Sequence, residues 1–98
     1  KDASPSWFGF PIFVKEEALF SRDEMVQFLE SQRIMTRMMF GGNLTKQPAY
    51  LDMNCRVFGK LGNTDRVMNQ LFWIGVYPGL TDAKLDYVIQ TLTGFLKG

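Results

Sequence analysis

Strand-like and helix-like patterns alternate along the first forty residues of the chain. Residues 7–14 are rich in aromatic and β-branched side chains and run into a charged trio, which predicts a strand followed by a turn. Pro11 lies inside this run and has no amide hydrogen, so it favours a sheet edge or a bulge. Ser21 and Glu24 have the spacing of a capping box, which predicts a helix from about residue 22.

The first helix and the segment after it differ in their periodicity. Met25, Phe28 and Leu29 recur at helical spacing and are expected to form the buried stripe of the helix. Residues 33–40 return to a strand-like pattern. Residues 41–43, Gly-Gly-Asn, tolerate positive φ and are expected to end that strand.

The middle of the chain shows neither period for long. Residues 44–62 are punctuated by glycine and proline and predict a long loop, with a short extended piece near 56–58. Asn63 or Thr64 is expected to cap a short helix, and residues 71–77 predict a third strand.

The last helix carries the clearest pattern. Pro78 and Gly79 predict a turn, after which Thr81 is placed to cap a helix. Apolar residues then recur at intervals of three and four: Leu85, Val88, Ile89, Leu92, Phe95 and Leu96. Three strands and three helices in this order predict an α+β fold, a two-layer sandwich of a small, mostly antiparallel sheet with helices on one face.

Length, composition and charge limit the classes of function. Ninety-eight residues, 46% of them hydrophobic, suit one small domain. Eleven basic residues against ten acidic ones give a net charge of +1, far from the basic excess that binds nucleic acid or an anionic membrane. No apolar run approaches the roughly 18 residues of a membrane helix, so a soluble cytoplasmic protein is expected.

The chain contains no histidine and a single cysteine. Without histidine, Ser-His and Cys-His nucleophile pairs and the usual zinc ligands are absent, which argues against a self-contained hydrolase or metalloenzyme. Cys55 is interpreted as a structural core residue, because a lone thiol cannot form an internal disulfide or hold a metal alone. The first residue is not methionine, which suggests a piece of a longer protein.

Two groups of residues could bind a ligand, and each has an ordinary structural alternative. Arg37 and Lys46 flank a glycine pair whose amides could approach a phosphate, although a solvated turn with surface charges would look the same. The aromatic residues of 7–14 could line a pocket, but at strand spacing a place in the core is favoured.

Motifs spread over nearly the whole chain form a specific combination. They are Ser6-Trp7-Phe8-Gly9-Phe10-Pro11, Thr36-Arg37 through Asn43-Leu44, Gln47-Pro48-Ala49-Tyr50, Asn63-Thr64-Asp65-Arg66 and Phe72-Trp73 through Leu80-Thr81. Together they resemble the C-terminal end of the CDP-4-keto-6-deoxy-D-glucose 3-dehydrases, enzymes of lipopolysaccharide biosynthesis within the DegT/DnrJ-type sugar aminotransferase superfamily.

The resemblance implies that residues 1–98 are the C-terminal small domain of a fold type I pyridoxal-phosphate enzyme, without the large domain that binds the cofactor. It further implies pyridoxamine phosphate and a [2Fe-2S] cluster in the parent enzyme, both bound mainly outside this chain. The chain alone is then expected to be inactive and to contain no catalytic residue and no metal ligand.

The resemblance also implies substrate contacts. Arg37 and Lys46 would face the diphosphate, and Asn43 and Tyr50 would face the sugar or nucleotide. Phe8, Phe40 and Trp73 would form apolar walls. Phe8 and Phe40 lie at or near positions where the aminotransferases of the superfamily have histidine, and this difference favours dehydration over amino transfer.

The expected substrate is a nucleotide-linked 4-keto-6-deoxy sugar, and the parent enzyme is expected to be a homodimer served by a reductase. One alternative is a pyridoxal-phosphate-dependent nucleotide-sugar aminotransferase of the same superfamily. Another is a free-standing module that binds a small ligand or stacks nucleic-acid bases. The balanced charge disfavours the second, and neither nucleic acid nor membrane is an expected partner.

Overall fold

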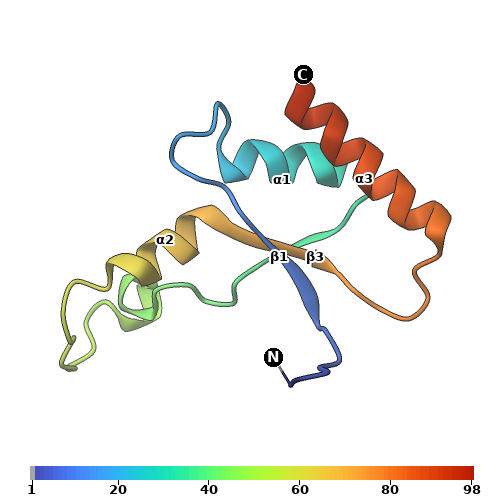
Figure 1. Ribbon diagram of the computed structural model, residues 1–98. Coiled ribbons are helices and arrows are strands. Elements are labelled where there is room, and N and C mark those ends of the chain that lie inside the picture. Colours follow the sequence, from blue (N-terminus) through green and yellow to red (C-terminus); the bar gives the residue numbers. More distant parts are fainter. Residues whose placement is uncertain (1) are drawn as a thin grey trace.

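The computed structural model describes residues 2–98 and contains one antiparallel sheet with three helices (Figure 1). In chain order the elements are β1 (Gly9–Phe13), α1 (Arg22–Ser31), β2 (Thr36–Met38), the 3₁₀ turns η1 (Leu44–Lys46) and η2 (Pro48–Tyr50), α2 (Gly62–Gln70), β3 (Leu71–Gly75) and α3 (Asp82–Lys97). The α+β class and the order of strands and helices predicted from the sequence are confirmed.

The sheet has the order β1-β3-β2, with both neighbours antiparallel to the central strand. Pro11 therefore lies on an edge strand, as its missing amide hydrogen requires, and pairs with Trp73. Ile12 lies opposite Phe72 in the register, and residues directly opposite one another share a face of the sheet. Ile12 and Phe72 accordingly belong to the same apolar cluster.

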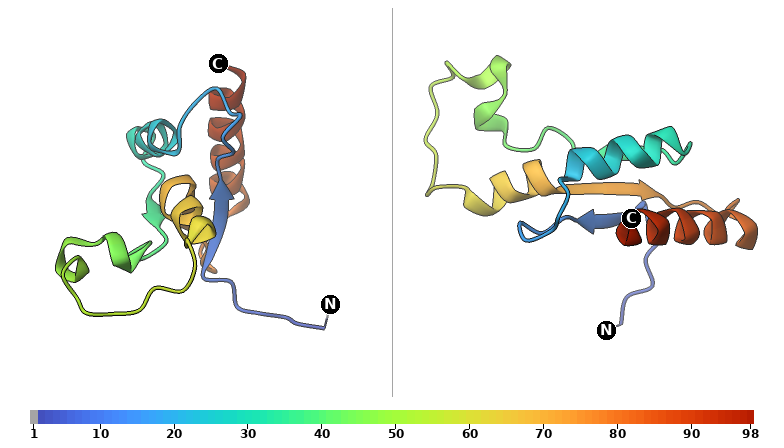
Figure 2. Two further views of the ribbon diagram at one scale, coloured as in Figure 1. Left: turned by 90° about the vertical axis from the view of Figure 1, so that its left-hand side faces the viewer. Right: turned by 90° about the horizontal axis from the view of Figure 1, so that it is seen from above.

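Helices α1 and α3 pack against one face of the sheet, whereas α2 lies beyond the start of β3 (Figure 2). Ser21 and Glu24 form the predicted capping box, and Thr81 caps α3. Within the described residues 2–98 the buried hydrophobic core consists of Val14, Met25, Leu29, Ile34 and Phe72. Phe95 joins the two helices, because its ring contacts those of Phe20 and Phe28.

The protein leaves an unusually large surface open to solvent. Its accessible surface is 8071 Å², whereas a compact protein of this mass exposes about 5,700 Å². Its radius of gyration is 16.4 Å, against about 13 Å for a compact chain of this length. The expectation that the aromatics of residues 7–14 belong to the core is wrong: Trp7, Phe8 and Phe10 are 69%, 73% and 58% exposed.

The second strand and the long loop differ from their predictions. Only Thr36–Met38 of residues 33–40 is a strand, because Arg33 and Phe40 have φ values of 62° and 45°, incompatible with extended backbone. The predicted loop contains η1 and η2, and residues 56–58 form no strand.

Two further predictions in this region are wrong. Neither Asn63 nor Thr64 caps α2: the helix begins two or three residues earlier than expected, at Gly62, after Leu61 with φ 52°, and has no side-chain cap. Cys55 is exposed rather than buried in a core, since the whole stretch 51–60 lies at the surface.

A carboxylate joins the end of α1 to β2. Glu30 Oε1 accepts hydrogen bonds from the buried Thr36, 2.7 Å from its amide nitrogen and 2.8 Å from its hydroxyl oxygen. These bonds hold the pKa of Glu30 below its ordinary value of 4.5, with a smaller contribution from the nearby charge of Arg37.

We expect this contact to make stability dependent on acid. A carboxylate with a lowered pKa in the folded state stabilises the fold above pH 4.5, and this contribution is lost as the pH falls through the folded pKa. Urea unfolding between neutral pH and about pH 3 should therefore show a smaller acid-induced loss for Glu30→Gln than for the wild type. Glu17→Gln, in the exposed turn before α1, is the control and should keep the wild-type loss. An equal acid-induced loss of stability in the wild type and in Glu30→Gln would contradict this assignment.

Candidate functional site

A cavity of about 760 Å³ opens between the end of β3, the segment before β2 and the start of α3. Its walls are mainly aromatic and aliphatic, and include Phe8, Ile34, Trp73, Tyr77, Leu85 and Val88. A cavity of this size suits a small molecule or a short piece of another chain. We call it the groove.

Two stacked aromatic side chains form one wall of the groove. The rings of Phe8 and Trp73 have centroids 4.6 Å apart and planes tilted by 37°. The indole Nε1 of Trp73 donates a hydrogen bond of 3.1 Å to the carbonyl of Met38, which fixes the ring over β2. Gly9 leaves space for this ring, because a Cβ there would overlap indole atoms of Trp73. The wall therefore depends on a glycine one residue after Phe8.

The charged side chains among the described lining residues are all cationic: Arg33, Arg37 and Lys84. Arg37 is exposed and donates to the carbonyl of Thr36 at 2.9 Å, and the remaining donors of its guanidinium can reach a ligand. The Nζ of Lys84 lies 3.3 Å from the hydroxyl of Tyr77 and 5.7 Å from the centre of its ring. An apolar groove with a cationic rim is suited to a ligand that combines an anionic group with a flat or aliphatic body.

The residues after β2 form a second polar site. We call residues 41–50 the glycine loop. Asn43 is only 3% exposed; its Nδ2 donates to Asp65 at 2.8 Å and its Oδ1 accepts from the amide and hydroxyl of Thr45. Lys46 forms an ion pair with Asp65 at 3.0 Å. The bond from Asn43, followed by those with Lys46, holds the pKa of Asp65 below its ordinary value.

The seven residues expected to contact substrate are divided between the groove and residues 40–50, which are the glycine loop and the residue before it. Phe8, Arg37 and Trp73 line the groove. The other four belong to the segment next to α2, which lies at the opposite end of the protein from α3 (Figures 1 and 2). Phe40 and Tyr50 are exposed there, at 79% and 42%.

Internal bonds limit what the glycine loop offers a ligand. The side-chain amide of Asn43 is occupied at both ends, and Lys46 already faces a carboxylate. Their substrate roles remain predictions, and Lys46 would have to exchange Asp65 for the ligand. Arg33 and Lys84 of the groove were missed by sequence reasoning. Lys84 lies three residues after the cap Thr81, and nothing local to that helix shows that it faces Tyr77.

Comparison with known proteins assigns the family. The sequence model of the DegT/DnrJ/EryC1/StrS aminotransferase family matches residues 1–93. The chain belongs to this family. Among curated relatives it is 53% identical over 93 residues to the lipopolysaccharide biosynthesis protein RfbH of Salmonella typhimurium, an alignment that covers 95% of this chain and 21% of the relative.

A second relative of this DegT/DnrJ/EryC1/StrS chain has an explicit activity in its name. The chain is 46% identical over 94 residues to the dTDP-4-dehydro-2,6-dideoxy-D-glucose 3-dehydratase of Saccharopolyspora spinosa, covering 96% of this chain and 20% of that enzyme. The chain thus spans about a fifth of the length of each relative. No helix within residues 2–98 is long and apolar enough to cross a membrane.

The residues of this family member cannot by themselves hold the pyridoxal-type cofactor or the [2Fe-2S] cluster that the resemblance implies. A pyridoxal-type cofactor needs a partner for its pyridine nitrogen and anchors for its phosphate. The described lining of the groove supplies cations but no carboxylate, and its one lysine lies on an exposed rim. An iron–sulfur cluster is usually held by four cysteines, and this chain has one, Cys55.

Proposed function

We propose that this chain is the C-terminal small domain of a pyridoxamine-phosphate-dependent 3-dehydratase, which removes the C3 hydroxyl from a nucleotide-linked 4-keto-6-deoxy sugar in dideoxysugar biosynthesis. Its identity of 46% to a 3-dehydratase carries the proposal. Its identity of 53% to a lipopolysaccharide biosynthesis protein supports the same pathway class. The cofactor and the iron–sulfur cluster would be held by the rest of the parent enzyme, a homodimer that receives electrons from a reductase.

The large exposed surface supports the proposal that the chain functions within a larger protein. It exposes about 2,300 Å² more than a compact protein of its mass would. A small ligand covers only a few hundred Å², whereas permanent protein interfaces bury about 2,000 Å² or more in total. Leu85, Ile89 and Leu96 of α3 contribute to this surface although they lie on the apolar stripe of the helix. The remaining domain of the parent is the proposed cover.

Within the parent, the groove would bind and orient the substrate rather than transfer protons. Arg37 on the rim would pair with the diphosphate, because a guanidinium can donate two parallel hydrogen bonds to phosphate oxygens. Phe8 and Trp73 would exclude water from the adjacent part of the substrate. Bound at its own site, the cofactor would supply the amine that reacts with the 4-keto group and the electron sink for loss of the hydroxyl.

Product analysis of the full-length parent protein tests the reaction. With a nucleotide-linked 4-keto-6-deoxyglucose and a reductant, a 3-dehydratase yields a product without the C3 oxygen, which mass spectrometry resolves. A product that retains this oxygen and gains an amine from an amino donor would make the parent a sugar aminotransferase, the activity for which the family is named.

Replacement of Arg37 tests the role of the groove in the same protein. Arg37→Met keeps most of the apolar stem and removes the charge, and we expect KM for the nucleotide sugar to rise about tenfold or more. Arg56→Met, in the exposed stretch 51–60 outside the groove, is the matched control and should leave KM unchanged. An unchanged KM for Arg37→Met would show that the diphosphate does not bind at Arg37 in this groove.

A further inference from the structure

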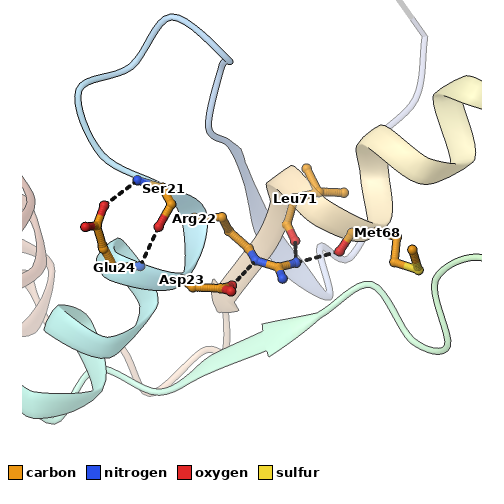
Figure 3. A network of polar contacts seen from close by, with 6 residues as sticks. All are labelled: Ser21, Arg22, Asp23, Glu24, Met68 and Leu71. Carbon is orange, nitrogen blue, oxygen red and sulfur yellow. Dashed lines mark hydrogen bonds and ion pairs between the residues drawn. The ribbon is translucent and has the colours of Figure 1, made fainter.

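Arg22 joins the start of α1 to the end of α2 (Figure 3). Its Nη1 donates to the carbonyl of Met68 at 2.7 Å and to that of Leu71 at 3.3 Å, and its Nε donates to Asp23 at 2.9 Å. The side chain is only 13% exposed. Arg22 thus contacts residues 46 and 49 positions away in the sequence.

The position of Arg22 is unfavourable for its own helix and favourable for another. As the first residue of α1 it places a cation at the positive end of the helix dipole. The last turn of α2 contains no basic residue, and the carbonyl of Met68 is one of the four at its C-terminus that helix geometry leaves without a helical partner. Arg22 supplies both the missing cation and the donor. A cation that is unfavourable at the start of α1 but satisfies the C-terminus of α2 indicates that the tertiary structure, rather than α1 itself, requires Arg22.

The end of α2 in turn holds the glycine loop. The sulfur of Met68 accepts a hydrogen bond from the amide of Asn43 at 3.3 Å, and the same side chain lies against Gly42, where it leaves no room for a Cβ. One turn earlier in α2, Asp65 binds both Asn43 and Lys46. A continuous set of contacts therefore runs from the guanidinium of Arg22 through α2 to the glycine loop.

We propose that Arg22 is a positioning residue that sets the placement of α2, and through it of the glycine loop, relative to the sheet. Helix α2 lies beyond the start of β3, outside the layer formed by α1 and α3 (Figure 2). The chain runs from α2 directly into β3, and the amide of Val14 donates to the carbonyl of Gln70 at 2.9 Å. Arg22 adds the side-chain contact that reaches this end of α2 from α1. The consequence for substrate binding, though not the link itself, rests on the proposed function, in which the glycine loop faces the sugar nucleotide.

Hydrogen exchange of the full-length parent protein tests the link without any substrate. Arg22→Met removes the donors and keeps an apolar stem, so amide exchange should rise about tenfold or more at residues 43–50 and 65–71. Exchange across α3 should stay unchanged. Ser21→Ala is the matched control, because it removes the neighbouring cap of α1 but no contact with α2, and it should affect α1 alone. Arg22→Lys should restore part of the protection, since an ammonium can still donate to the carbonyl of Met68.

Two results would overturn the proposal. One is unchanged exchange at residues 43–50 in Arg22→Met. The other is an equal rise over every element including α3, which would mean a general loss of stability. Steady-state kinetics then separate this proposal from the function: Arg22→Met should raise KM for the nucleotide sugar with little change in kcat. A rise in exchange with unchanged KM would support the link from Arg22 through α2 to the glycine loop, but would show that the glycine loop does not contact the substrate.

Discussion

Replacing Phe72 with alanine is expected to destabilise the fold by about 3–5 kcal/mol, the usual cost of emptying a fully buried aromatic position. Phe72 is 0% exposed and lies on the central strand, where it contacts the core residues of α1. The core of the described residues contains four other buried hydrophobic side chains, so little remains to compensate. A small domain with a typical total stability near the low end of about 5–15 kcal/mol would lose most of it.

Urea unfolding followed by circular dichroism measures this loss. Phe58→Ala is the matched control: the same atoms are removed from a side chain that is 87% exposed, and the free energy of unfolding should change by less than about 0.5 kcal/mol. Equal effects of the two substitutions would show that Phe72 is not the centre of the core.

Gly9→Ala should have the second largest effect, a loss of about 1–3 kcal/mol from overpacking. The added Cβ would overlap the indole of Trp73, which is held by Phe8 on one side and by the carbonyl of Met38 at its nitrogen. The ring must move, and the aromatic wall of the groove is lost with it. Fluorescence of a Trp7→Phe background, in which Trp73 is the remaining tryptophan, should report the displacement as a red shift.

Gly75 provides a control at the same point of the sheet. It pairs directly with Gly9 in the register, but a Cβ there would meet nothing within 4 Å. Gly75→Ala should therefore leave the stability and the emission of Trp73 close to those of the parent background. If both substitutions shift the emission equally, the wall does not depend on the close approach of Gly9.

The groove and the glycine loop are held in place by different elements of the fold. Trp73 is fixed by the sheet itself, through its place on β3 and its bond to Met38. Asn43 and Lys46 are held by Asp65 of α2, and the carbonyl of Met68 in the same helix accepts a hydrogen bond from Arg22.

The sequence predicted features that depend on neighbours a few residues apart. The capping box at Ser21 and Glu24, the cap at Thr81 and the turn at Pro78 are each confirmed, because each is formed within about one helical turn. Pro11 on an edge strand follows equally directly from its missing amide hydrogen. Together with the order of strands and helices, these local signals established the α+β class.

Burial and the composition of the site were decided by tertiary structure alone. Phe72 and Phe10 look alike in their strand patterns, yet one is fully buried and the other is 58% exposed, because α1 and α3 cover only part of the sheet. The predicted site residues divide between the groove and residues 40–50 because α2, against which the glycine loop packs, lies away from the sheet. Arg22 shows the physical reason most clearly: its local position favours an acidic residue, and only a carbonyl brought close by folding, 46 residues away in the sequence, explains the cation.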